Sequence, residues 1–388
     1  MQNKSKPLIP GDLQRRQQRM RQLRNWAILL GAIMVVVIGV LVVGGLFFGS
    51  GFGNSRITAL SLPCYAHQDV TVFRDGVLYY DGASIHFVNA GGGIEWSHST
   101  GDNASFTVSD SQIIIWRGFH LTILNANGDP SYDQDMTETI QFARIGSNHA
   151  AIITGEPLTP TVYVKDLQGA QMDTEVSRFD GHYLLDCGFY GARDEYLWTL
   201  SYDFYNPVVS SVLHTFQVGQ MNTGIATITP HLPDKVLYLN NMLNVFTTQQ
   251  MYTFDYKGVK DTENTMLVYG WKYIDHDAAS RDNANILLAP AKQADETQTM
   301  TDLRVLSTTL DRRFTLPSPC FGAAIRSDRI FAFSPEYIYS GHLNSQRFYA
   351  HDVPLPDERL VSEFVGLTTN GYAIVTSGSE VYSVSLPK

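Results

Sequence analysis

The stretch that decides the fold is residues 70–97, which read VTVFRDGVLYYDGASIHFVNAGGGIEWS. It divides into four short runs, VTVFRD, GVLYYDG, ASIHFVNA and GGGIEWS, in which apolar or aromatic side chains alternate with polar ones. Alternation with a period of two is typical of strands, and the Gly and Asp residues between the runs are typical of tight turns. Residues 70–97 therefore predict one antiparallel meander of four strands.

The same order of strands recurs along the rest of the chain. Further copies follow at residues 106–132, 141–172, 183–229, 235–261, 265–317 and 321–353, and a copy of three strands fills residues 364–388. Seven intervals between equivalent positions span 295 residues, or about 42 residues each, which matches the four-stranded blade of a β-propeller. The second strands of the copies are expected to begin near Gly76, Ser111, Asn148, Glu195, Met242, Asn285, Arg329 and Gly371.

The two ends of this repeat predict how the ring closes. The last copy lacks a fourth strand, and residues 57–62 (ITALSL) supply a spare strand ahead of the first copy. If the spare strand completes the last blade, no edge is left open. We therefore predict an all-β propeller of eight four-stranded blades over residues 56–388, with seven blades as the alternative count. A β-sandwich pair or an irregular barrel would show similar strand spacing, but eight recurrences exceed what a seven-stranded sandwich supplies.

A different pattern precedes the repeat. Residues 26–48 read WAILLGAIMVVVIGVLVVGGLFF, 23 residues without a charge, which is long enough to cross a bilayer as one helix. This apolar stretch is too long for a cleaved secretory signal, so we expect a signal anchor followed by a tether at residues 49–55. Trp26 fits an interfacial anchor. The basic residues of the upstream tail place residues 1–25 in the cytoplasm and the propeller outside; they are Arg15, Arg16, Arg19, Arg21 and Arg24.

Charge divides unevenly along the chain. The whole protein has a net charge of -10, yet 7 of its 28 Lys and Arg residues precede Trp26, where Asp12 alone opposes them. The remainder carries 21 basic and 37 acidic residues, a net charge of -16. Such a body lacks the clustered positive charge that nucleic acid binding requires. It should also avoid anionic lipids and polymers, so a basic protein is the partner we expect.

Two segments carry a resemblance to a known group. FVNAGGGIEW (residues 87–96) and ILNANGDP (residues 123–130) resemble the strand, turn and strand ends of quinoprotein-like propeller repeats, where an Asn or Asp turn with Gly follows an apolar strand. With its anchor, the chain resembles single-pass, propeller-bearing envelope proteins of Gram-positive bacteria. The resemblance implies a propeller and, by analogy with assembly scaffolds of the bacterial envelope, a non-enzymatic role. We assign no cofactor.

Motifs for catalysis are missing from the sequence. It contains no HExxH, no GxSxG, no phosphate loop ending in GK[ST] and no Asp-box, so we assign no catalytic residue. The alternative to a binding role is a carbohydrate-active propeller enzyme, a glycoside hydrolase or lyase, with Asp194 and Glu195 as acid and base. Adjacent residues of one strand point to opposite faces, which makes that pair a poor fit for one glycosidic bond.

One acidic stretch could bind calcium. Residues 275–283 place Asp275, Asp277 and Asp282 close together, and hard oxygen ligands suit Ca²⁺. The stretch lacks the Gly turn and terminal Glu of an EF-hand loop and contains Arg281. We therefore expect it to be part of a solvated insertion at 275–285 between two strands, like the insertion at 203–208, and assign no metal.

The three cysteines lie outside the membrane in this topology. Cys187 and Cys320 each precede an arginine by six residues, which predicts innermost strands of two blades that are not neighbours, too far apart to bridge. With Cys64, they are expected to be small buried residues.

Aromatic side chains are the candidates for a contact surface. Tyr79, Tyr80 and Trp271 are among them, but most propeller aromatics pack between blades. The inserted stretch SYDFYNP places Tyr202, Phe204 and Tyr205 together, and we expect these three residues to form the binding surface.

Overall fold

A computed structural model describes residues 57–388 apart from 176–177, 192–194, 206–209, 230–231, 278–283 and 293–297. The predicted tail at 1–25, the predicted span at 26–48 and the tether at 49–55 lie outside the described residues. Within the described part of the chain, no helix is long and apolar enough to cross a bilayer.

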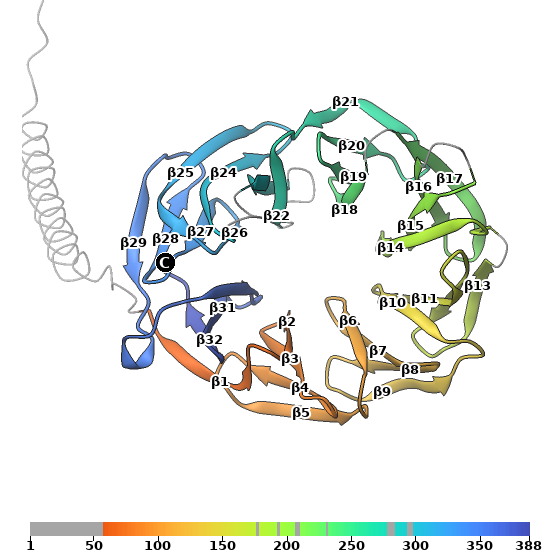
Figure 1. Ribbon diagram of the computed structural model, residues 1–388, viewed down its shortest axis with the longest axis horizontal. Helices are drawn as coiled ribbons and strands as arrows, with labels where there is room; N and C mark the ends of the chain where they lie inside the picture. Colours follow the sequence, from red (N-terminus) through yellow and green to blue (C-terminus); the bar gives the residue numbers. More distant parts are fainter. Residues whose placement is uncertain are drawn as a thin grey trace, which may run out of the picture. The chain divides into compact units, whose positions relative to one another are not determined.

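The described chain forms a ring of eight four-stranded antiparallel sheets (Figure 1), which confirms the predicted eight-bladed propeller. In seven blades the strands follow one another from the channel outward, so the order in the sheet is the order in the sequence. Blade 1 is built from β2 (Asp69–Phe73), β3 (Gly76–Tyr80), β4 (Ser84–Asn89) and β5 (Ile94–Ser99), and blade 2 from β6 (Ser105–Val108), β7 (Gln112–Arg117), β8 (His120–Asn125) and β9 (Pro130–Asp135). Blade 3 is built from β10 (Ile140–Ile145), β11 (His149–Glu156), β12 (Thr159–Asp166) and β13 (Gln171–Glu175). Blade 4 is built from β14 (His182–Tyr190), β15 (Tyr196–Asp203), β16 (Ser210–Gln217) and β17 (Gln220–Ile228).

The second half of the ring repeats this arrangement. Blade 5 is built from β18 (Pro233–Leu239), β19 (Met242–Thr247), β20 (Gln250–Phe254) and β21 (Lys260–Leu267), and blade 6 from β22 (Trp271–Asp277), β23 (Asn285–Pro290), β24 (Met300–Leu306) and β25 (Asp311–Cys320). Blade 7 is built from β26 (Gly322–Arg326), β27 (Arg329–Phe333), β28 (Tyr337–His342) and β29 (Phe348–Asp352). Blade 8 is built from β30 (Glu363–Leu367), β31 (Tyr372–Ser377), β32 (Glu380–Ser385) and β1 (Ala59–Tyr65). A short 3-10 helix, η1 (Pro356–Glu358), lies between blades 7 and 8.

The ring closes through the spare strand, as predicted. β1 pairs antiparallel with β32, with Ala59 opposite Val384 and Leu60 opposite Ser383. The first strand of the ring thus supplies the outer strand of the last blade, and the hydrogen-bonding edge of β32 is covered.

The predicted repeat positions hold, with two corrections. The second strand of each blade begins within one residue of its predicted start. β21 continues to Leu267, however, so Thr265 belongs to blade 5 and not to blade 6. The predicted insertion at 275–285 is also shorter, because Asp275 and Asp277 are residues of the inner strand β22.

The core lies between neighbouring blades. Middle strands are mostly buried, as in β16, while the outer strand β5 combines exposed and half-buried residues. One cluster joins Leu78 of blade 1 to Ile113 of blade 2, and another joins Phe333 of blade 7 to Val375 of blade 8. Burial of such faces against each other is the main force that holds blades together.

A turn of one kind joins the third and fourth strands of four blades. Asn89, Asn125, Asp166 and Asp255 each accept two backbone N–H groups on a side-chain oxygen, two and four residues ahead. Each turn also has a glycine at positive φ, for example Gly128 at 83°. In three of these turns a side chain of the neighbouring blade packs on the glycine: a methyl group at Gly128 would lie 2.5 Å from the Trp96 ring. Gly258, in the fourth turn, faces the backbone of Gly224 and Ile225 in blade 4. The turn therefore locks neighbouring blades together.

Candidate functional site

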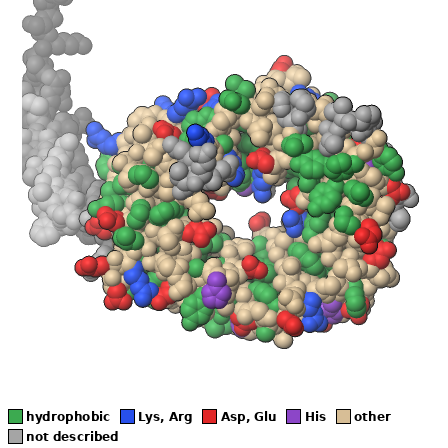
Figure 2. Space-filling model, viewed as in Figure 1, with side chains coloured by type: hydrophobic (Ala, Val, Ile, Leu, Met, Phe, Trp, Pro, Cys, Tyr) green, Lys and Arg blue, Asp and Glu red, His purple; other side chains and the backbone are tan. Residues whose placement is uncertain are grey.

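Four large apolar side chains at one end of blades 3 and 4 are exposed to solvent. Tyr205 is 72% exposed, Phe204 50%, Leu158 49% and Tyr183 45%. Together with the half-buried Tyr202 they are called the aromatic patch below. Figure 2 shows hydrophobic side chains gathered over the side of the ring that carries β14 and β15. Contiguous exposed apolar surface of this kind is uncommon on soluble domains and often marks an interaction site.

Gly181 holds the three segments of the aromatic patch together. Its N–H donates to the carbonyl of Leu158 at 2.8 Å, and its carbonyl accepts the N–H of Phe204 at 3.1 Å. Its φ of 74° is in the left-handed region, and a methyl group there would come within 2.3 Å of Cδ2 of Tyr205. The ring of Tyr205 therefore rests on a position that glycine alone fills easily.

The rings of the inserted stretch are held in place as well. The N–H of Tyr205 donates to Oδ1 of Asp203 at 2.8 Å. The rings of Tyr202 and Phe204 meet edge to face with centroids 6.4 Å apart. Tyr183 lies opposite Tyr202 in the β14–β15 register. The predicted trio thus lies together, while Leu158, Tyr183 and Gly181 were missed because they follow ordinary hairpin and strand patterns.

The other aromatic candidates do not join this surface. Tyr79 is buried and stacks on His86 with centroids 4.8 Å apart. The hydroxyl of Tyr80 donates to the carbonyl of Gly101 at 2.7 Å. Trp271 is half-buried, and Cζ of the Arg313 guanidinium lies 5.4 Å from its ring centroid. These three residues pack within and between blades.

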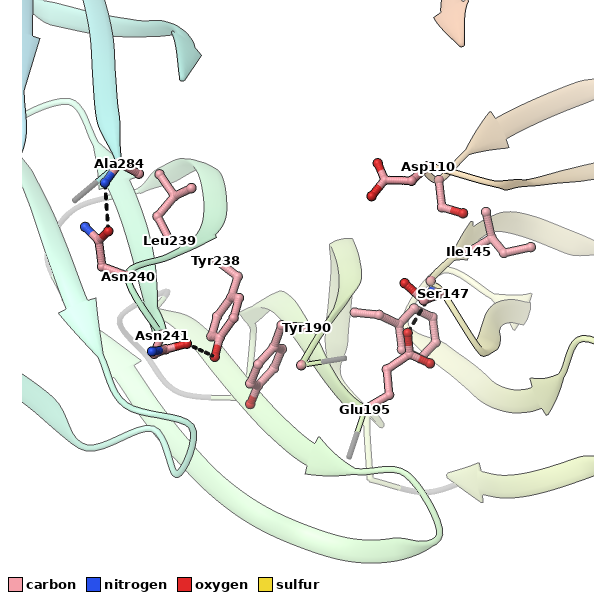
Figure 3. Close-up of a pocket in the computed structure, with 14 residues that line it drawn as sticks. Asp110, Ile145, Ser147, Tyr190, Glu195, Tyr238, Leu239, Asn240, Asn241 and Ala284 are labelled. Carbon is pink, nitrogen blue, oxygen red and sulfur yellow. Dashed lines mark hydrogen bonds between the residues drawn. The ribbon is translucent and has the colours of Figure 1, made fainter. Parts of the chain in front are cut away.

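The first-to-second-strand loops of blades 2 to 5 surround a cavity of about 540 Å³. Figure 3 shows Asp110 pointing into it from one wall and Tyr190 and Tyr238 side by side on another. The two tyrosine rings are 4.8 Å apart, and Tyr190 itself is only 5% exposed. Because the Tyr190 ring is buried in this way, a ligand in the cavity cannot stack on it.

Glu195, next to blade 4, forms hydrogen bonds with residues of blade 3. Its carboxylate accepts the N–H of Ser147 at 2.8 Å (Figure 3). It also lies 2.6 Å from Nδ1 of His149. Asn148 adds a longer backbone N–H contact of 3.3 Å. Only 2% of the Glu195 side chain is exposed. This carboxylate is therefore already occupied by donors of its own chain, and Asp194, the other member of the predicted acid and base pair, lies outside the described residues.

The acidic stretch of blade 6 starts inside the sheet. Oδ2 of Asp275 accepts the N–H of Ile325 in the next blade at 2.8 Å, and burial raises the pKa of this carboxyl to about 6. Asp282 lies outside the described residues, so the calcium alternative stays a prediction. Among the residues that the structure describes, no group of three His, Cys, Asp or Glu side chains is arranged to hold a metal ion.

All three cysteines are free and buried, as predicted. Burial raises the pKa of Cys64 and of Cys320 to about 12 and also raises that of Cys187, so none is a reactive thiolate at neutral pH. Cys187 lies on the inner strand β14, but Cys320 ends the outer strand β25. The predicted inner position of Cys320 is wrong, because a single residue separates β25 from β26 and the sequence shows no turn there.

A buried histidine stands out in the same interface of blades 3 and 4. His214 is 5% exposed, and its Nδ1 has no hydrogen-bond partner. The rings of Phe179 and Phe216 surround it, with centroids 5.4 and 5.9 Å away. Burial, together with the charges of His182 and Arg178, lowers the pKa of His214 to about 4.

Comparison with known proteins supports the fold alone. The sequence matches no family model and no curated protein. By structure the chain is similar to BamB from Moraxella catarrhalis, at 11% identity over 86% of this chain and 97% of that chain, with a TM-score of 0.50. It is also similar to the WD40 domain of Pan2 from Neurospora crassa (7% identity, 86% and 96% of the chains, TM-score 0.46) and to a eukaryotic initiation factor (12% identity, 84% and 91%, TM-score 0.48). The chain is a propeller similar in fold to BamB.

Proposed function

We propose that this protein is a membrane-anchored, extracytoplasmic β-propeller that acts as a non-enzymatic binding or scaffolding module for an envelope protein or a wall polymer. The observation that carries the proposal is the aromatic patch, whose four most exposed side chains offer apolar surface that no part of the described chain covers. The anchor rests on the uncharged stretch at 26–48 and the basic tail before it.

The carbohydrate-active alternative has less support. Glycoside hydrolysis needs two carboxyl groups about 5 to 10 Å apart with one able to give a proton. Of the proposed pair, Glu195 already accepts two backbone N–H groups and faces His149. Both oxygens of this carboxylate therefore already contact donors of their own chain.

Cross-linking in the native cell tests the binding role. A photo-activated residue in place of Tyr205 should yield a defined cross-linked envelope protein or wall polymer, and one in place of Tyr349, which is 59% exposed on blade 7, should not yield the same product. A purified protein that cleaves wall glycans, with no cross-linked product from any exposed position, would refute the binding role. The anchor is tested separately, by labelling of cysteines introduced before and after residues 26–48 from outside intact cells.

A further inference from the structure

The aromatic patch lies in an acidic part of the propeller. Residues 150–233 contain nine acidic and three basic residues. Three of the acidic residues stand in the segments that form the patch: Glu156 in the β11–β12 hairpin, Asp180 beside Gly181, and Asp203 before Phe204. Arg178, two residues before Asp180, donates to Glu175 at 2.8 Å, so its charge is already balanced. The patch therefore combines an apolar centre with a negative rim.

We propose that the aromatic patch docks a cationic, amphipathic segment of a protein partner, with leucine-like or aromatic side chains against Phe204 and Tyr205 and lysines or arginines beside Glu156 and Asp180. The proposal rests on the proposed binding function and names the site and the chemistry of the partner. Aromatic anchors at the centre of an interface supply most of its binding energy, and complementary charges at the rim supply selectivity and faster association. A lysine or arginine above the exposed ring of Tyr205 adds a cation–π contact.

The negative rim argues against the other occupants. In a symmetric dimer formed through this surface, the patch would meet its own copy, and the three acidic residues of each subunit would face like charges. An anionic wall polymer would meet the same repulsion. A cationic protein segment meets no such repulsion, because the positive charges of the segment neutralise the acidic residues of the rim.

Peptide binding tests this proposal directly. The full chain is held in zwitterionic nanodiscs, and empty nanodiscs serve as the blank. The probe is a fluorescent amphipathic peptide of lysine and leucine, compared with one in which glutamate replaces every lysine and one in which serine replaces every leucine. We expect the lysine–leucine peptide alone to bind, with affinity that falls as salt increases because the rim charges are screened.

Variants locate the bound peptide. Phe204→Ser with Tyr205→Ser should weaken binding by about tenfold or more, the usual effect of removing central aromatic anchors. Glu156→Gln with Asp180→Asn should weaken it less and flatten the salt dependence. The matched controls are Tyr349→Ser for the aromatic change and Glu336→Gln with Asp352→Asn for the charge change, all on exposed positions of blade 7. Thermal unfolding shows that each variant retains the fold.

Several results would overturn the proposal. They are equal binding by the Phe204→Ser, Tyr205→Ser variant, equal binding of the glutamate peptide, or self-association of the full chain that this double variant abolishes. If native-cell cross-linking identifies a partner on another face while the patch binds no peptide, the binding function stands and this assignment of the site fails. If no partner exists and the protein cleaves glycans, the function itself fails.

Discussion

Replacing His214 by leucine should make the propeller less sensitive to acid. The imidazole is enclosed by Phe179 and Phe216, and the charged groups facing it are His182, on the inner strand, and Arg178, which pairs with Glu175. Leucine is apolar and does not titrate, and the Nδ1 that it removes has no hydrogen-bond partner. The substitution therefore removes the titration, and the loss of Nδ1 leaves no donor or acceptor without its partner.

The magnitude follows from the difference in pKa between the unfolded and the folded chain. Above pH 6.5 the imidazole is neutral in both states and contributes nothing to pH dependence. Between pH 6.5 and the folded pKa of about 4, the unfolded chain binds a proton that the folded chain excludes, so the free energy of unfolding falls as pH falls. At about 1.4 kcal/mol for each pH unit, the loss is roughly 2 kcal/mol at pH 5 and about 3 kcal/mol below pH 4.

Urea unfolding at pH 7.5 and pH 5, followed by tryptophan fluorescence, measures this effect. We expect the native protein to lose about 2 kcal/mol more than His214→Leu over this interval. His120 is the matched control: its hydrogen bond to Asp135 raises its pKa, so its contribution is present at low pH and is lost as pH rises, and His120→Asn should change the pH dependence in the opposite direction. The same pH dependence in the native protein and in His214→Leu would refute the reasoning.

Three further predictions concern the joints between blades. Gly128→Ala should lower the free energy of unfolding by about 2 to 4 kcal/mol, because a positive φ and a clash with Trp96 combine. Gly219→Ala, at a similar φ of 79° but with open space around it, should lower it by only about 1 to 2 kcal/mol. Equal losses in the two variants would show that the contact with Trp96 is unimportant. Glu195→Gln should lower thermal stability by about 1 to 3 kcal/mol without affecting the aromatic patch, and an unchanged melting temperature would contradict its role between blades. Removing residues 57–65 should expose the edge of β32 and cause association in size-exclusion chromatography, whereas a stable monomer would show that closure through β1 is dispensable.

The repeat was readable from the sequence because its signals are local. Alternating side chains and Gly or Asp turns recur about every 42 residues, and they placed all eight second strands within one residue. The turn after the third strand is also legible as Asn or Asp followed by Gly three residues later. Residues 87–96 and 123–130 revealed it in two blades, while the copies at Asp166 and Asp255 became apparent from their hydrogen bonds.

The errors fall where no local signal marks a boundary. Cys320 was placed on an inner strand because the distance to the next arginine matched that of Cys187, yet β25 runs to Cys320 without an intervening polar turn. Asp275 was placed in a loop by its polar neighbours, but its position in β22 is set by pairing with Leu287 of the next strand. Pairing with a distant strand overrides local composition at both places.

The sequence by itself determined the strand repeat and the closure of the ring, because each depends on the order of side chains within a short window. The membrane anchor, which lies outside the described residues, stays a prediction from the same kind of local pattern. Only the tertiary structure decided the candidate site. Leu158, Gly181 and Phe204 are far apart in the sequence, and backbone hydrogen bonds between two blades bring them together. The role of Glu195 was likewise visible only in the tertiary structure. The N–H groups of Ser147 and Asn148 donate to its carboxylate, so Glu195 connects two blades and is not free for catalysis. Such contacts depend on how neighbouring sheets pack, which no local pattern of side chains encodes.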